Sequence, residues 1–216
     1  MTSLTRRGAL ALGVAALSAP VLTATRALAQ GLSADDQALV DRAVAYLEGL
    51  SEAKGRFMQI APNGSVSEGA LYMKRPGKAR FDYDPPAGLL VVSDGGRVSI
   101  ANSKLKTFES YPLMATPLSL FLARQIRLDR GVVISRVSRL SDGFSITAKD
   151  GKKQAEGQIV LDFNDAPLRL AGWTVTDAQG QSTRIRLTKL EKTSGLAPSL
   201  FVLKDPRNLN PGRAKM

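Results

Sequence analysis

The sequence predicts a mostly-β protein with helices, an α+β fold built on a long antiparallel meander. From Arg56 onward, apolar and polar side chains alternate with a period of two over about ten short segments. Turn dipeptides separate these segments, at Asn63-Gly64, Asp94-Gly95, Asp142-Gly143, Asp150-Gly151 and Gln179-Gly180. Two other stretches, residues 33–50 and 116–122, follow helical spacing instead. These patterns alone leave a closed barrel, a half-barrel and a sandwich open.

Residues 1–29 are predicted to be a cleaved signal peptide. Arg6 and Arg7 precede an apolar run over residues 8–22, and residues 27–29 (Ala-Leu-Ala) form a small-x-small cleavage site. The apolar run is shorter than the roughly 20 residues that a membrane-spanning helix needs. We therefore expect export to the periplasm by the Sec or the twin-arginine route. Residues 30–216 are expected to form a single domain.

The composition argues against catalysis. The 216 residues include no histidine and no cysteine, so the commonest general base and the thiolate nucleophile are both missing. We find no Walker-type glycine loop, G-x-S-x-G motif or metal-spaced cluster, and we expect no enzyme activity, no cofactor and no metal. Basic side chains, among them Lys104, Lys106, Arg184 and Arg186, favour anionic lipid headgroups or acidic docking faces over nucleic acid, and a generally basic soluble protein is the other interpretation. We expect a monomer.

A first helix is predicted from Ser33, which can accept a hydrogen bond at the helix start. Asp35 and Asp36 in the first turn favour the positive end of the helix dipole. An apolar stripe follows at helical spacing, formed by Leu39, Val40, Ala43, Val44, Leu47 and Leu50. One side of this helix is therefore expected to cover a sheet.

Two strands and a turn are predicted over residues 71–94. Leu71, Met73 and Arg75 fall on one strand face, because side chains at i, i+2 and i+4 point the same way. Pro76 and Gly77 form the turn, after which a second strand returns. The expected inward set could line a cavity or simply fill a core, and consists of Leu71, Met73, Phe81, Tyr83, Leu90, Val92, Val98 and Ile100.

A short second helix is predicted after Thr116, which is followed by proline at the first helical position. Its apolar residues are Leu118, Leu120, Phe121 and Leu122. Asp82 and Asp84 share a strand face and, with Glu109, could supply a hydrolase-like carboxylate pair. Their place at a strand end makes solvated surface residues the simpler interpretation.

Four short sequence motifs resemble those of the periplasmic outer-membrane lipoprotein carrier family, LolA. These are RPGK at residues 75–78, FDYDPP at 81–86, LVVSDG at 90–95 and ATPLSLFLA at 115–123. The resemblance implies an incomplete, strongly curved antiparallel β-barrel with a helical lid over an apolar cavity. It also implies a chaperone that carries lipoproteins from the inner to the outer membrane. The implied partners are acylated lipoproteins, an inner-membrane lipoprotein-releasing ABC transporter and an outer-membrane lipoprotein receptor.

The resemblance also assigns residue roles. Arg75 is expected to be a lid latch that donates hydrogen bonds to lid carbonyls. The acyl-binding cavity candidates are Leu71, Met73, Phe81, Tyr83, Leu90, Val92, Val98, Ile100, Leu120 and Phe121. The chain departs from the family at Ala79, where phenylalanine is usual, and at Phe81, where tryptophan is usual. A periplasmic lipid or lipoprotein sensor of the same fold is the alternative function.

Overall fold

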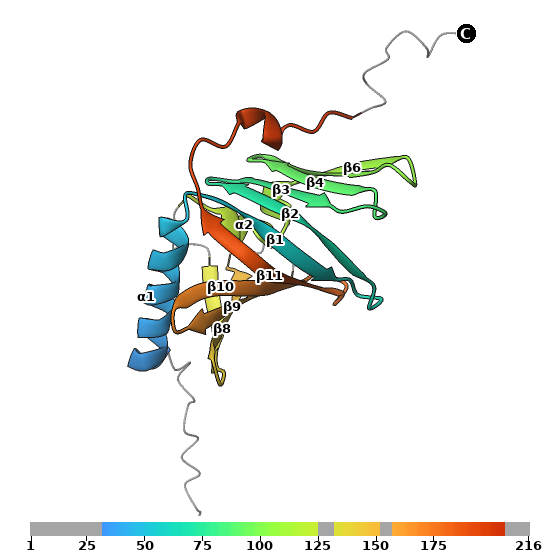
Figure 1. Cartoon of the computed structure of the whole chain (residues 1–216). Coiled ribbons are helices and arrows are strands. Elements are labelled where there is room, and N and C mark those ends of the chain that lie inside the picture. Colours follow the sequence, from blue (N-terminus) through green and yellow to red (C-terminus); the bar gives the residue numbers. More distant parts are fainter. Residues whose placement is uncertain (1–31, 125–131, 152–156, 206–216) are drawn as a thin grey trace, which may run out of the picture. The chain divides into compact units, whose positions relative to one another are not determined.

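The computed structural model describes residues 32–124, 132–151 and 157–205, so the expected signal peptide lies outside the described residues. One antiparallel sheet of 11 strands runs in the order β6-β5-β4-β3-β2-β1-β11-β10-β9-β8-β7 (Figure 1). The strands are β1 Glu52–Ile60, β2 Val66–Lys74, β3 Lys78–Tyr83, β4 Leu89–Asp94, β5 Arg97–Asn102, β6 Thr107–Pro112, β7 Val132–Arg139, β8 Gly143–Asp150, β9 Gln158–Asp165, β10 Leu168–Thr176 and β11 Ser182–Lys192. Strands β6 and β7 are the two edges and do not pair with each other, so the barrel is open. The predicted fold class is confirmed.

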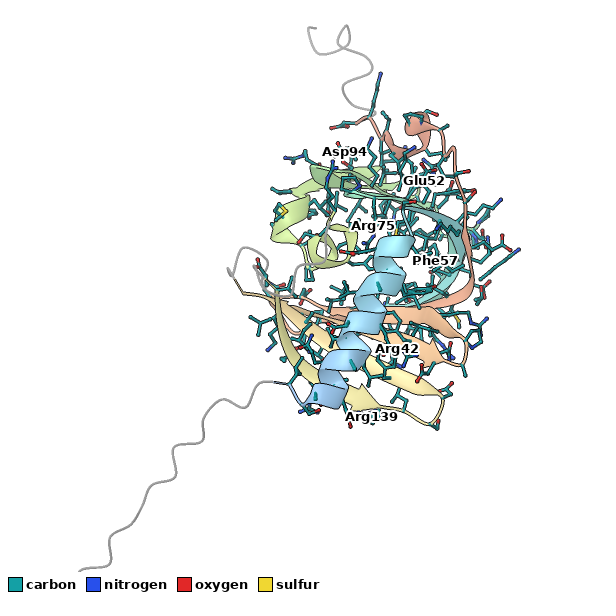
Figure 2. All side chains as sticks on the ribbon, turned by 90° about the vertical axis from the view of Figure 1, so that its left-hand side faces the viewer. Arg42, Glu52, Phe57, Arg75, Asp94 and Arg139 are labelled. Atoms are coloured by element: carbon teal, nitrogen blue, oxygen red, sulfur yellow. The ribbon has the colours of Figure 1, made fainter. Side chains whose placement is uncertain are left out.

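Helix α1 (Ala34–Gly49) begins as predicted, because the Ser33 hydroxyl accepts a hydrogen bond from the Asp36 backbone at 3.1 Å. Its buried side chains are Leu39, Val40, Ala43 and Leu47. Two exposed ion pairs hold its outer side to the sheet, Arg42 with Asp165 and Arg139 with Asp36 (Figure 2). Across the described ranges, no helix has the length and apolar character needed to cross a membrane.

Pairing between β2 and β3 sets the inner face of the sheet. Leu71 lies opposite Phe81 and Met73 lies opposite Ala79, and all four side chains are buried. The Phe57 ring of β1 meets the Phe81 ring edge-on, with 5.5 Å between ring centroids. Because directly opposed residues share a face, the expected apolar face of these two strands is confirmed.

Strand β4 departs from the expected alternation. Phe81 pairs with Val91, which places Val91 on the inner face and both Leu90 and Val92 on the outer face. Val92 is nevertheless buried, because the C-terminal turn η2 (Pro198–Phe201) packs over β3 and β4. The inward assignment of Leu90 and Val92 is therefore wrong. Both faces of β4 are apolar, so its residues carry no alternating signal.

Strand β5 keeps the expected assignment. Ile100 pairs with Val91 and Val98 pairs with Ser93, so Val98 and Ile100 lie on the inner face. Ala101 lies on the outer face, beside Leu90.

The C-terminal segment crosses the outer face of β1 to β4. The Leu196 backbone N–H donates to the Glu52 carboxylate at 2.8 Å, and the Lys74 ammonium donates to the Leu196 carbonyl at 3.2 Å. Lys74 and Glu52 also pair at 2.7 Å, and Arg80 donates to the Leu200 carbonyl at 3.3 Å. These bonds fix η2 on the outside of the sheet and leave the inner face to the helices.

Candidate functional site

An apolar cavity lies between α1, the short helix α2 (Leu118–Leu122) and strands β7 to β9. Every residue that lines it is apolar: Val40, Ala43, Val44, Leu47, Phe121, Val132, Ile134, Ile146, Ala148, Ile159 and Leu161. Its volume is about 30 Å³. An apolar cavity of about 150 Å³ accommodates benzene. The closed space is therefore far too small for an acyl chain, and a ligand could enter only if a wall moved.

Phe121 of α2 is the wall residue that joins this cavity to the rest of the core. Its ring is buried and stacks on Trp173 of β10, with centroids 5.2 Å apart and planes 29° apart. Trp173 in turn meets Phe81 edge-on at 6.1 Å. The Arg75 guanidinium carbon lies 5.6 Å from the Phe121 centroid, within range of a cation–π contact. Phe121 thus lies between the aliphatic cavity and an aromatic cluster under β1 to β3, and contacts both.

Two hydrogen bonds fasten the C-terminal end of α2 to the turn between β2 and β3. An Arg75 side-chain N–H donates to the Phe121 carbonyl, and the Gly77 backbone N–H donates to the Leu122 carbonyl at 2.8 Å. We call these two bonds the latch. Carbonyls at a helix end have no partner within the helix, so they are free to accept such donors. The Ser93 hydroxyl donates to the Gly77 carbonyl at 2.5 Å and steadies the turn.

The Arg75 side chain is held in an unfavourable environment. Burial lowers its pKa to about 10, and the carboxylate of Glu48 acts in the opposite direction. Figure 2 shows Arg75 near the C-terminal end of α1, where Glu48 lies. Its Nε and Nη1 atoms are buried without a hydrogen-bond partner among the described residues. Arg75 remains charged at neutral pH, so its burial costs the closed state free energy.

The C-terminal end of β3 carries a second polar feature on the inner face. The Tyr83 hydroxyl donates to the Gln59 side-chain oxygen at 2.5 Å, and the Tyr83 ring meets Phe57 edge-on at 5.0 Å. Burial raises the pKa of Tyr83 to about 12, and the bond to Gln59 acts in the opposite direction. This neutral pair joins the C-terminal end of β3 to β1.

The ten cavity residues expected from the sequence fall in different places. Only Phe121 lines the cavity. Four are buried core residues on the inner face beside it, Leu71, Met73, Phe81 and Val98, and two are half-buried on that face, Tyr83 and Ile100. Leu90 and Val92 lie on the outer face, and the side chain of Leu120 lies outside the described set.

Most of the observed cavity wall was not assigned from the sequence. The helical stripe of α1 and the alternating residues of β8 and β9 signal burial, but not that they surround an open space. Trp173 was not among the predicted site residues, although it is the only tryptophan of the chain and such a large side chain is a candidate for the core.

The two carboxylates of the hydrolase alternative have structural partners. Both Asp84 oxygens accept from the Arg56 guanidinium, and this hydrogen bonding lowers the pKa of Asp84. Asp82 accepts from Arg80 at 2.9 Å. Each carboxylate is thus bound to an arginine of the same sheet.

This fold and site define a class of open antiparallel barrels that enclose an apolar interior under a helical lid. The family model described as outer membrane lipoprotein carrier protein LolA matches residues 48–204, and the chain belongs to this family.

Comparison with known proteins gives relatives at low identity. An outer-membrane lipoprotein carrier protein from Chromobacterium violaceum is 28% identical over 199 residues, covering 88% of this chain and 95% of the relative. One from Methylobacillus flagellatus is 25% identical and covers 75% of this chain and 82% of the relative. Among solved structures, a LolA superfamily protein from Nitrosomonas europaea aligns with a TM-score of 0.44 at 10% identity, covering 76% of this chain and 97% of that one.

Proposed function

We propose that this protein is a periplasmic chaperone that carries acylated lipoproteins from the inner to the outer membrane. The observation that carries the proposal is a wholly apolar cavity closed by a five-residue helix that is fastened by a two-bond latch. Membership of the lipoprotein carrier family supports it. The task is physical and requires no covalent chemistry, because the protein only has to keep acyl chains out of water.

The energies of the latch and the ligand are well matched for such a carrier. A net hydrogen bond is worth about 1 kcal/mol, and one with a charged donor about 1.5–3 kcal/mol. Each methylene removed from water contributes about 0.8 kcal/mol. The two bonds together are therefore worth about 3 kcal/mol, and the cost of burying the Arg75 charge offsets most of this, so burial of a few methylenes is enough to open the lid. An acyl chain can open the lid by occupying the interior, and its departure lets the lid close.

The proposed partners follow from this role. An inner-membrane lipoprotein-releasing ABC transporter supplies the acylated cargo, and an outer-membrane lipoprotein receptor accepts it. The carrier itself acts as a monomer in the periplasm after removal of residues 1–29. The predicted leader and the family description support this assignment.

The experiment compares a diacylated lipoprotein with the same polypeptide whose acylated cysteine is replaced by serine. We expect the purified chain from Gln30 to hold only the acylated form in a soluble complex on gel filtration, and to release it to outer-membrane vesicles. Equal association with both forms would refute acyl recognition. Stable retention without transfer would instead identify a lipid or lipoprotein sensor.

Two variants locate the binding space. Ala148→Phe fills the cavity wall, whereas Val202→Trp adds bulk at an exposed position after η2. We expect Ala148→Phe to weaken acyl binding and Val202→Trp to leave it unchanged. Val44→Trp, at a half-buried wall position, serves if Ala148→Phe does not fold. Normal acyl binding by a folded wall variant would show that the ligand lies elsewhere.

A further inference from the structure

The turn between β5 and β6 exposes an apolar side chain between two lysines. Leu105 is 71% exposed, the largest value among the exposed large apolar residues of the described chain. Lys104 and Lys106 on either side are also exposed. Lys106 adopts a left-handed conformation with φ of 54°, which turns the chain back into β6. We call residues 104–106 the tip.

The backbone of the tip is fixed by its neighbours. The Asn102 side-chain oxygen accepts from the backbone N–H groups of Lys104 and Leu105, each at 3.0 Å. The backbone N–H of Ser103 donates to the Gly88 carbonyl at 2.8 Å. A surface contact through Leu105 therefore needs little ordering of the backbone, which lowers the entropic cost of binding.

The carboxylates that line a hollow together with a tip lysine have other partners. Asp82 pairs with Arg80, and both Asp84 and Glu68 pair with Arg56. Within the part of the chain that the structure describes, neither tip lysine forms an ion pair with a carboxylate. The tip thus combines an apolar side chain with two cations that are available to an external anion.

A hollow of about 690 Å³ lies behind the tip. Its lining includes Lys106, Leu89, Leu90 and Tyr83. The ring of Tyr83 belongs to the aromatic cluster of the inner face. An amphipathic molecule held at the tip would therefore lie beside a recess that reaches the edge of the core.

We propose that the tip docks the protein on a lipid bilayer with an anionic surface. Leu105 enters the interfacial region, while Lys104 and Lys106 contact headgroup phosphates. An apolar side chain flanked by cations is suited to this interface, because burial and electrostatic attraction act together there. The proposal concerns the protein without cargo, so its failure would leave the carrier function untouched.

The first test measures binding of the cargo-free chain from Gln30 to sedimented vesicles. Vesicles of about one part phosphatidylglycerol to three parts phosphatidylethanolamine supply the anionic surface, and pure phosphatidylcholine supplies the neutral one. We expect Leu105→Ser to weaken binding to the anionic vesicles about tenfold. Lys104→Gln and Lys106→Gln should each weaken it about fivefold, and added salt should weaken it further.

Leu140 provides the matched control, because it is 50% exposed in the turn between β7 and β8 and follows Arg139. Leu140→Ser should change binding by less than about twofold. Equal affinity of Leu105→Ser and the unmodified protein would overturn the proposal. So would a complete lack of binding to anionic vesicles, which would leave an acidic protein surface as the partner for these lysines.

A second test asks whether the side chain enters the bilayer. Leu105→Trp and Leu140→Trp are compared in vesicles whose acyl chains carry bromine, which quenches nearby indoles. We expect quenching of the tryptophan at position 105 only, because Trp173 is buried in the core and gives a constant background. Equal quenching at positions 105 and 140, or none at 105, would overturn insertion by the tip.

Discussion

Replacement of Arg75 by leucine should stabilise the closed protein, although it removes a bond of the latch. Burial lowers the Arg75 pKa from its ordinary value to about 10. At 1.36 kcal/mol per unit, the native state bears a cost of about 3 kcal/mol for this charge. The native state binds the proton less tightly than the unfolded chain, so this cost is complete below about pH 10 and decreases as pH rises above 10. The hydrogen bond to the Phe121 carbonyl returns about 2 kcal/mol.

The burial cost of the Arg75 charge exceeds the energy of its hydrogen bond by about 1 kcal/mol. We therefore predict a free energy of unfolding about 1 kcal/mol higher for Arg75→Leu, measured by urea titration with far-ultraviolet circular dichroism. A more stable closed state should also weaken binding of a fluorescent acyl probe about fivefold. Arg75→Lys keeps a buried charge without the planar fork and should be less stable than the unmodified protein. Arg80→Leu, on the outer face, should lose about 1 kcal/mol with its pairing to Asp82. A loss of more than about 1 kcal/mol in Arg75→Leu would refute the proposed balance.

Three further predictions concern the lid, the inner face and α1. Phe121→Ala should lower the free energy of unfolding by about 3–5 kcal/mol in urea titration, because it empties a buried aromatic site. Tyr83 should ionise near pH 12 in an ultraviolet absorbance titration. Its contribution to stability, measured as the difference between the unmodified protein and Tyr83→Phe, should fall by about 3 kcal/mol as pH rises from 10 to 12, because the unfolded phenol loses its proton first. Arg42→Ala breaks an exposed ion pair with Asp165 and should cost less than about 1 kcal/mol in thermal melts, with no effect at high salt.

The inward-facing residues of the strands could be predicted from the sequence wherever one face of the sheet is exposed to solvent. The prediction failed where both faces are covered. Leu71, Met73 and Phe81 alternate with polar residues, so their common face was assigned correctly. Residues 89–92 are apolar throughout, and an unbroken apolar run does not indicate which of its residues face the inside of the sheet. Its outer face is covered by η2, about a hundred residues later in the chain, through contacts that no local pattern records.

The position of the cavity could not be predicted for a related reason. Ala43 of α1, Ala148 of β8 and Phe121 of α2 come together only through long-range packing. Apolar alternation shows that such residues face inward, but the space left between them depends on how closely the elements approach. The latch role of Arg75 could be predicted because the motif RPGK resembles that of a known family, and the structure shows its hydrogen bond to the Phe121 carbonyl.

Half of the latch belongs to the main chain, which changes how this protein can be studied by mutation. The donor at Gly77 is a peptide N–H that every residue except proline carries, so its loss would never appear in an alanine scan. A side chain there would meet the Cα of Gly95 at 2.7 Å, and φ is +75°, so any substitution disturbs the turn before it tests the bond. Only replacement of that amide by a backbone ester would remove the donor and keep the shape. Side-chain replacement therefore tests the Arg75 bond directly, whereas at Gly77 it reports only the distortion of the turn.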